Sequence, residues 1–471
     1  MFDFLSSDPA PARRDFSKSI EKDFSGCADF ESRALSAGGV SLTLFYLDGC
    51  VSAAQISGEI VRPLSLLRAR SEHDLLTRAL EGGVWACTVR QRSSPEEAVS
   101  DIAAGYAALV FDDESTALTF EVKSGVNAPT VEKSVLGAKD AFVESVRVNT
   151  ALLRRRVGKP SLKLWETMLG SETKTRVDIL YIEGEAPPEQ VERIKARLSL
   201  PDIPAVLAAG DVEQYLAGTP RGIFPQVIHT ERPDRFVLGL ARGKIGVLCD
   251  GLPIGFLLPA SLPDMLRVQE DRARHAAVAT ALVLLRYLAL FLSLALPALY
   301  VAIAMYHQEM IPYKLLQNVI DSKQSVPFST AAETLGMLLS FELLQEAGIR
   351  LPDPVGQTVS VIGALIVGQS AVEAKVLSPI VIIVVAMAGI AGYAQPSQEL
   401  GAAIRLWRVA LVLGAVVLGL YGVMAELMLL LWRLCDTENL GVSYLSPLTD
   451  SRPGSLRRTF LRPPLRKEDR K

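Results

Sequence analysis

The chain is poor in the residue types on which most metal and redox sites depend. Its 471 residues include 5 cysteines and 4 histidines. The cysteine count is odd and no pair has the CxxC spacing of a redox or zinc site, which argues against a disulfide framework and indicates a reducing compartment for the soluble part. The histidines are scattered, and none has a metal-ligand partner at helical spacing. We therefore expect neither a metal nor another cofactor. The four histidines are His73, His229, His275 and His307.

Motifs of the common enzyme classes are also missing. The sequence contains no GxxxxGK[ST], no GxSxG, no HExxH and no GxGxxG after a strand. The beginning, "MFDFLSSDPAPARRDF", has too short an apolar stretch for a signal peptide. We expect a protein that is not an enzyme and whose soluble region is not exported.

Charge is nearly balanced overall but unevenly distributed. The chain has 49 basic and 52 acidic residues. Charged residues are frequent up to residue 275, and long apolar runs occupy residues 276–434. Residues 451–471 hold eight lysines or arginines against two acids. The basic cluster "LLRRRVGK" is expected to be a solvated helix end, with contact to nucleic acid or anionic lipid as the alternative. We expect no nucleic-acid partner.

The first half of the chain has the pattern of two small α/β domains. After a polar lead-in of residues 1–35, "VSLTLFYLDG" predicts a strand, and "YAALVFDDESTALTFEVKS" predicts a hairpin. These belong to a first domain, residues 36–145. The second domain, residues 146–262, ends in "KIGVLCDGLPIGFLLPA", which predicts two strands around Asp250-Gly251. A linker, residues 263–280, follows.

The second half is expected to be a transmembrane helical domain, residues 281–434, because about 20 apolar residues suffice to span a bilayer. Basic residues flank the first span and fill the tail of residues 435–471, so both ends are expected on the cytosolic side. The fold class is therefore an α+β membrane protein: two cytosolic α/β domains, then an α-helical transmembrane domain with a broken or re-entrant helix region. The four candidate spans are residues 281–305, 355–372, 376–394 and 406–432.

An unusual helix with acids is predicted at residues 329–347. Glu342 and Glu346 are four residues apart and share a face, whereas Glu333 lies nearly opposite. Ionisable groups at membrane depth are costly and face a bundle interior or water. The helix is therefore interfacial, re-entrant or packed inside protein, where it would line a pore. The alternative is an ordinary amphipathic helix outside the membrane.

The next stretch, "QEAGIRLPDPVGQ", predicts a helix break. Gly348 can end the preceding helix, and Pro352 and Pro354 cannot continue one. Backbone freed at membrane depth is tolerated where protein or a water-filled cavity satisfies it, as in transporters and channels. Arg350 is placed to pair with Glu346. The candidate pore or gating residues are Glu333, Glu342, Glu346, Arg350, Gln357, Gln369 and Glu373, of which Glu373 has a turn between two spans as its alternative.

Several long segments resemble a known family. "YHQEMIPYKLL", "VPFSTAAETLGMLLSFELLQEAGIRLPDPVGQTVSVIGALIVGQSAVEAKVLSP" and "NLGVSYLSP" are similar to the A subunit of GerA-type spore germination receptors. In the soluble half, "VESVRVNTALLRRRV", "FPQVIHTERPDR" and "GKIGVLCDGLPIGFLLPASL" agree. The resemblance covers roughly residues 130–447. Lys375 departs from it, because a small residue is more usual at that position.

The resemblance implies a function that the residues alone do not. Members lie in the inner membrane of bacterial spores with a transporter-like B subunit, which binds the nutrient, and a lipoprotein C subunit. The A subunit is thought to form a ring of copies and the ion-conducting path that triggers ion release at germination, in contact with membrane lipids. The alternatives are a paralogous accessory protein of the dipicolinate-release channel and a non-conducting signalling scaffold of the receptor. A secondary transporter is a weaker hypothesis, because no inverted repeat is visible.

Overall fold

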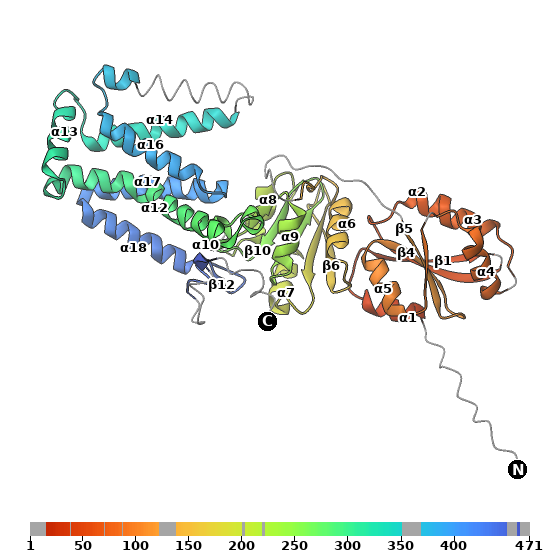
Figure 1. The fold of residues 1–471 in the computed structure, drawn as a ribbon. Coiled ribbons are helices and arrows are strands. Elements are labelled where there is room, and N and C mark those ends of the chain that lie inside the picture. The colour runs from red at the N-terminus through yellow and green to blue at the C-terminus, as the bar shows by residue number, and fades with distance from the viewer. Residues whose placement is uncertain are drawn as a thin grey trace, which may run out of the picture. The chain divides into compact units, whose positions relative to one another are not determined.

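The computed structural model divides the chain into two compact units (Figure 1). The α/β unit comprises Met1–Ala217 and Val227–Pro259, and the helical unit comprises Gly218–Gln226 and Ala260–Lys471. The structure describes residues 16–37, 39–69, 71–86, 88–121, 138–199, 203–218, 222–350, 369–449 and 459–461.

The first domain of the α/β unit is built on an antiparallel sheet in the order β1-β2-β4-β5-β3. Helices α1 (Phe16–Asp23) and α5 (Pro95–Ala103) pack together against β4. Helical turns α2 (Ala53–Gln55), η1 (Ile56–Val61), α3 (Arg62–Leu66), α4 (Glu72–Arg78) and η2 (Ala79–Gly83) connect β2 to β3. The strands are β1 (Phe30–Ala37), β2 (Val40–Leu47), β3 (Val89–Arg92), β4 (Tyr106–Phe111) and β5 (Thr116–Glu121).

The second domain has an antiparallel sheet in the order β6-β7-β9-β10-β8. Helices α6 (Val146–Val157) and α9 (Pro233–Leu240) pack together against β7 and β9. Helices α7 (Pro188–Ser199) and α8 (Ala209–Leu216) lie between β7 and β8 in the chain, and α7 packs on β6. The strands are β6 (Leu162–Leu169), β7 (Thr175–Ile182), β8 (Ile228–Thr230), β9 (Ile245–Cys249) and β10 (Gly255–Leu258).

The two domains share one topology, which the sequence did not lead us to expect. Each runs helix, two paired strands, a helical segment, one strand, a helix and a final hairpin. In each sheet the final hairpin lies between the second strand and the third. In each domain the first helix also packs on the helix before the final hairpin, α1 on α5 and α6 on α9. The α/β unit is therefore a tandem repeat of one fold.

The boundary predicted at residue 36 is wrong. Helix α1 and most of β1 lie inside the expected lead-in, residues 1–35. Phe16, Ile20 and Phe24 are at most 1% exposed and belong to the core of the first domain. Their spacing of four residues places them on one helical face, a short signal that the surrounding charges conceal. The predicted strand at "VSLTLFYLDG" and both predicted hairpins are confirmed.

The helical unit begins with two short helices and continues through a set of longer ones. The long helix α12 packs against α16 and α17, and α17 packs against α18. A two-stranded ribbon of β11 (Glu438–Asn439) and β12 (Val442–Ser443) follows α18. The helices are α10 (Leu262–Leu266), α11 (Glu270–Ala273), α12 (Ala276–Tyr306), η3 (Gln308–Met310), α13 (Tyr313–Lys323), α14 (Thr330–Arg350), α16 (Pro379–Tyr393), α17 (Gln398–Leu418) and α18 (Leu420–Asp436).

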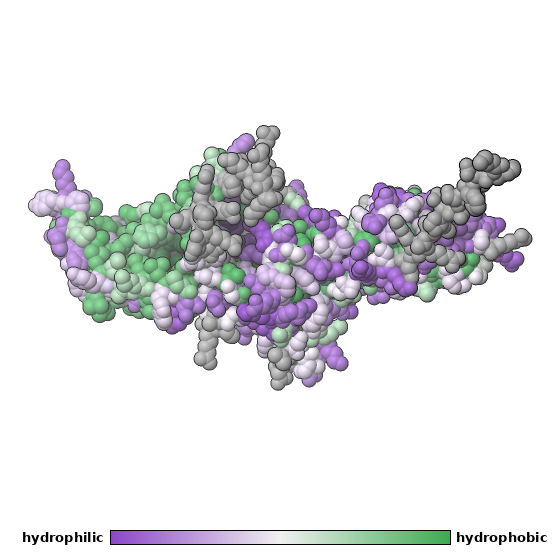
Figure 2. All heavy atoms as spheres, turned by 90° about the horizontal axis from the view of Figure 1, so that it is seen from below, coloured by the Kyte–Doolittle hydropathy of each residue, from purple (hydrophilic) through white to green (hydrophobic). Residues whose placement is uncertain are grey.

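By length and composition, α12 and α17 are the 2 helices in the described part of the chain that could cross a membrane, and α16 is a shorter apolar helix. The surface of the helical unit is largely apolar, as the green area of Figure 2 shows. Large apolar side chains are exposed on each of these helices. Examples are Leu285 and Phe291 on α12, Ile383 and Ile390 on α16, and Val417 on α17.

The span predicted at residues 406–432 is wrong, because two helices occupy that run. Gly419 has a φ of 60° and a ψ of −137° and joins α17 to α18. Only glycine adopts this conformation readily. The two helices fold back on each other so closely that a Cβ on Gly422 would lie 1.9 Å from the Gly414 carbonyl oxygen. The apolar run conceals the reversal, since hydropathy does not register backbone direction.

Two further boundaries differ from expectation. Helix α14 extends to Arg350, so Gly348 lies within the helix instead of ending it. The cost of a glycine inside a helix, about 1 kcal/mol, is small enough for the neighbouring turns to offset. The tail predicted at residues 435–471 begins with the β11–β12 ribbon, after which Tyr444 is buried and its carbonyl accepts a hydrogen bond from the Leu262 amide.

Candidate functional site

Glu333 is the most buried of the predicted acids. Its side chain lies near the start of α14 and is 0% exposed. Oε2 accepts a hydrogen bond from the Ser378 amide (2.7 Å) at the N-terminus of α16, and Oε1 lies 3.6 Å from Lys323 Nζ. A helix N-terminus favours negative charge, and a lysine beside it adds to that effect. Glu333 therefore fixes α14 to the beginning of α16.

Glu342 contacts a different helix. Its Oε1 lies 2.8 Å from Arg405 Nε on α17, and both side chains are partly exposed, at 47% and 33%. Between the two acids, the ring of Phe341 lies over Gly389 of α16, where any larger residue would clash with it. Helix α14 is thus held by two charged contacts, one to α16 and one to α17.

Arg408, which lies near one end of the span predicted at residues 406–432, is a buried cation. Its side chain is 4% exposed among α12, α16 and α17. Nη2 donates to Ser293 Oγ of α12 (2.5 Å), and Nε has no hydrogen-bond partner among the described residues. Gly392 leaves room for the guanidinium, since a Cβ there would lie 3.4 Å from Nη2. Pro297 of α12, four residues after Ser293, has no amide hydrogen to donate to the Ser293 carbonyl.

Arg286, near the start of α12, is paired. Its Nη1 and Nη2 donate to the two oxygens of Asp271 at 2.6 and 2.9 Å. The carbonyl of Arg286 accepts from the Gln395 side chain, just after α16. This polar cluster marks one end of the apolar helices. Ser293 lies seven residues further along α12, which at 1.5 Å per residue is about 10 Å from the cluster.

The other predicted residues do not join a common site in the described part of the chain. Glu346 is exposed on α14, and Gln369 and Glu373 are exposed before α16. Lys375 has a φ of 56°, so the chain turns there, in keeping with the turn alternative for Glu373. The backbone of Arg350 is helical. Pro352, Pro354 and Gln357 lie outside the described residues.

In the α/β unit, the basic cluster at the end of α6 is internal. Arg154 and Asp29 are both 0% exposed and pair through Nη2 and Oδ1 (2.7 Å) and through Nε and Oδ2 (2.9 Å). Arg154 Nη1 also donates to the carbonyl of Leu162 at the start of β6. The expectation of a solvated helix end is therefore wrong for Arg154, which ties the first domain to the second.

A buried carboxylate lies close to this contact. Asp178 on β7 is 0% exposed, and neither of its oxygens has a hydrogen-bond partner among the described residues. Glu166 of β6 is directly opposite and pairs with Arg147 (2.6 Å) and Arg176 (3.1 Å). Burial raises the pKa of Asp178 to about 7, an effect that the charge of Arg147 opposes.

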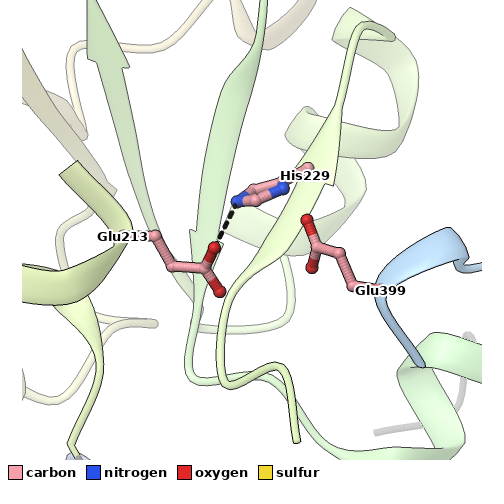
Figure 3. A group of neighbouring side chains, drawn as sticks. All are labelled: Glu213, His229 and Glu399. Atoms are coloured by element: carbon pink, nitrogen blue, oxygen red, sulfur yellow. Dashed lines mark ion pairs between the residues drawn. The ribbon is translucent and has the colours of Figure 1, made fainter. Parts of the chain in front are cut away.

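His229 of β8 has an acidic neighbour that helical spacing could not reveal. Its Nε2 lies 3.6 Å from Glu213 Oε2, on α8 (Figure 3). The His229 ring also packs edge-on against Phe256, with centroids 5.1 Å apart. The two residues come from different elements, which fold together only in the tertiary structure.

Comparison with known proteins shows the family to which the chain belongs. The family model described as "Bacillus/Clostridium GerA spore germination protein" matches residues 18–471. The chain is 34% identical over 93% of its length, and 86% of the relative, to an uncharacterized membrane protein YfkQ of Bacillus subtilis. It is 33% identical to spore germination protein KA of the same organism, over 87% of this chain and 76% of that one.

A solved structure is also similar. The N-terminal domain of the A subunit of the Bacillus megaterium spore germinant receptor GerK3 matches 51% of this chain and 92% of its own, at 25% identity and a TM-score of 0.39.

The chain combines two tandem α/β domains with a helical unit that has two apolar helices of spanning length. The family model extends over nearly the whole chain. The protein belongs to the GerA spore germination family, whose members are A subunits of spore germination receptors.

Proposed function

We propose that the helical unit inserts into the inner membrane of the spore and forms or gates an ion-conducting path that opens when a nutrient is sensed. The observation that carries this proposal is Glu333, an acid 0% exposed inside an apolar helical unit and paired with Lys323. Burying charge is expensive, and in membranes such residues mark ion pathways or gates.

The contacts of α14 support a gating role. Glu333 hydrogen-bonds to the start of α16 and Glu342 pairs with α17. A helix held by a few polar contacts between apolar neighbours can exchange one set of contacts for another. Such exchange between discrete packings is how small signals become large structural changes. Helix α14 is the element we expect to move.

The partners of this function are also proposed. A transporter-like B subunit would bind the nutrient, a lipoprotein C subunit would complete the receptor, and copies of this chain would form a ring around the path. In this arrangement the α/β unit and the C-terminal tail face the cytosol, and no catalysis is involved. Genes for B and C subunits beside the gene for this chain would favour a receptor over the paralogous accessory protein of the dipicolinate-release channel.

The test is nutrient-triggered ion release from spores that carry Glu333→Gln. The amide keeps the shape of the side chain but removes the charge beside Lys323, so we expect slower or incomplete release. Glu309→Gln is the matched control, because that side chain is 75% exposed. Immunoblots would verify equal receptor levels. Unchanged release in the glutamine variants of Glu333, Glu342, Glu346 and Glu373 alike would overturn the assignment.

A second candidate function is a non-conducting scaffold that relays the state of a partner. The engagement of Glu333 and Glu342 in contacts between helices favours this function, since both contacts have a packing role. Conductance measurements on the reconstituted chain with its partners separate the two functions. Absence of nutrient-dependent current in a complex that still binds nutrient would favour the scaffold.

A further inference from the structure

Arg408 lacks the acid that a buried cation normally has. Among the described residues, its one hydrogen bond is to the neutral hydroxyl of Ser293, and its Nε has no partner there. An arginine cannot lose its charge as lysine does, so the cost of burial has to be met by a partner. Arg405, which pairs with Glu342, lies on the same helix three residues before Arg408.

Helix α17 carries two arginines, Arg405 and Arg408, that could pair with Glu342 of α14. Glu342 pairs with Arg405 at 2.8 Å, in a contact that is partly exposed. Arg408 lies three residues later on α17, on the same helical face and about 4.5 Å further along the axis. Within the apolar layer, a pair with Arg408 would be worth more than a pair at the exposed position, because screening by water is weaker there.

We propose that Arg408 is the alternate partner of Glu342, and that α14 shifts along α17 by about one helical turn when Glu342 exchanges Arg405 for Arg408. The inference rests on the proposed function, to which it adds the moving contact. The shift also breaks the hydrogen bond between Glu333 and the Ser378 amide, which lies at the other end of α14. The Phe341 ring is seated over Gly389 of α16, so the shift must also move this ring away from its present position.

Distance measurement by electron paramagnetic resonance tests the shift without nutrient or ion flow. Spin labels on cysteines at Leu339 of α14 and Leu406 of α17 suit this purpose, because both side chains are exposed, at 62% and 64%. The full chain, with Cys87 and Cys435 replaced by alanine, is reconstituted in vesicles. Arg405→Gln should add a second distance population, which differs from the original by up to the axial shift of about 4.5 Å, whereas Arg408→Gln should keep the original distance. Arg405→Lys, which retains the positive charge, should show the original distance alone.

Two outcomes overturn the proposal: an unchanged distance in Arg405→Gln, or the same displacement in Arg408→Gln. Ion release from spores gives a second readout. Arg405→Gln should lower the nutrient concentration for half-maximal release by about threefold and Arg408→Gln should raise it, since each variant favours the other pair. If both arginines had a purely structural role, the two variants would change the half-maximal nutrient concentration in the same direction, and this result would count against the exchange. A third outcome separates the two proposals. If Arg405→Gln shows the displaced distance but spores with the unsubstituted chain, like those with the variant, release no ions, the proposed function is refuted and the exchange is not.

Discussion

Replacing Arg154 by leucine should strongly destabilise the α/β unit. The guanidinium makes two hydrogen bonds to Asp29 and one to the Leu162 carbonyl, and both charged side chains are 0% exposed. Removing it leaves a buried carboxylate without its partner. Breaking a buried ion pair in this way costs about 3–5 kcal/mol. A buried carbonyl that loses its donor adds about 1 kcal/mol or more.

The measurement is urea unfolding of residues 16–259, followed by the combined fluorescence of Trp85 and of Trp165 on β6. The double variant Arg154→Leu with Asp29→Leu removes both charges, so it should recover most of the lost stability. Arg193→Leu is the control, because its ion pair with Glu189 is exposed and worth about 0.5 kcal/mol. A loss below about 1 kcal/mol in Arg154→Leu, similar to that of the control, would refute the reasoning.

Three further predictions concern the second domain. The pKa of Asp178 is raised from 3.8 to about 7 in the folded state. The free energy of unfolding should therefore fall by roughly 4 kcal/mol in total as the pH rises between these values. Urea unfolding of Asp178→Asn, measured across the same pH range, should not show this fall. Gly246→Ala should lower the melting temperature, because its Cβ would lie 2.2 Å from the Phe236 ring, whereas Gly210→Ala meets nothing within 4 Å and should not. The Cys249 thiol, whose pKa is raised by burial, should react with a thiol reagent only after unfolding.

Local pattern was sufficient for two hairpins, although the hairpin β1–β2, whose strands also follow one another directly, was missed. The hairpins β4–β5 and β9–β10 were predicted because alternating apolar runs flank turn residues. The order of strands within each sheet was not predicted, because it depends on which edges meet after folding. The repeat of one topology in the two domains is likewise invisible in the residue types, since many sequences satisfy the same alternation.

The surroundings of charged residues were the feature that the sequence predicted least well. Three adjacent arginines at the end of α6 have the pattern of a solvated helix end, yet Arg154 is buried by an aspartate 125 residues away. Arg408 lies near one end of the predicted span of residues 406–432 and was not singled out as a site residue, yet it is buried inside the helical unit. Glu333 and Glu342 were singled out as candidate site residues, but their partners on α16 and α17 come from distant parts of the chain. Sequence shows that a charge is present, whereas its partner is decided by tertiary packing.

The joint at Gly419 has a mechanical consequence. A single residue joins α17 to α18, so the connection between the two helices is short. The close approach of Gly414 and Gly422 keeps the two helices in tight contact next to this joint. Beyond α18, the ribbon of β11 and β12 leads to Tyr444, which is tied to α10 ahead of α12. A movement of α14 against α17, as proposed above, would therefore also reach α18 and, through the ribbon and Tyr444, the short helix α10 that precedes α12.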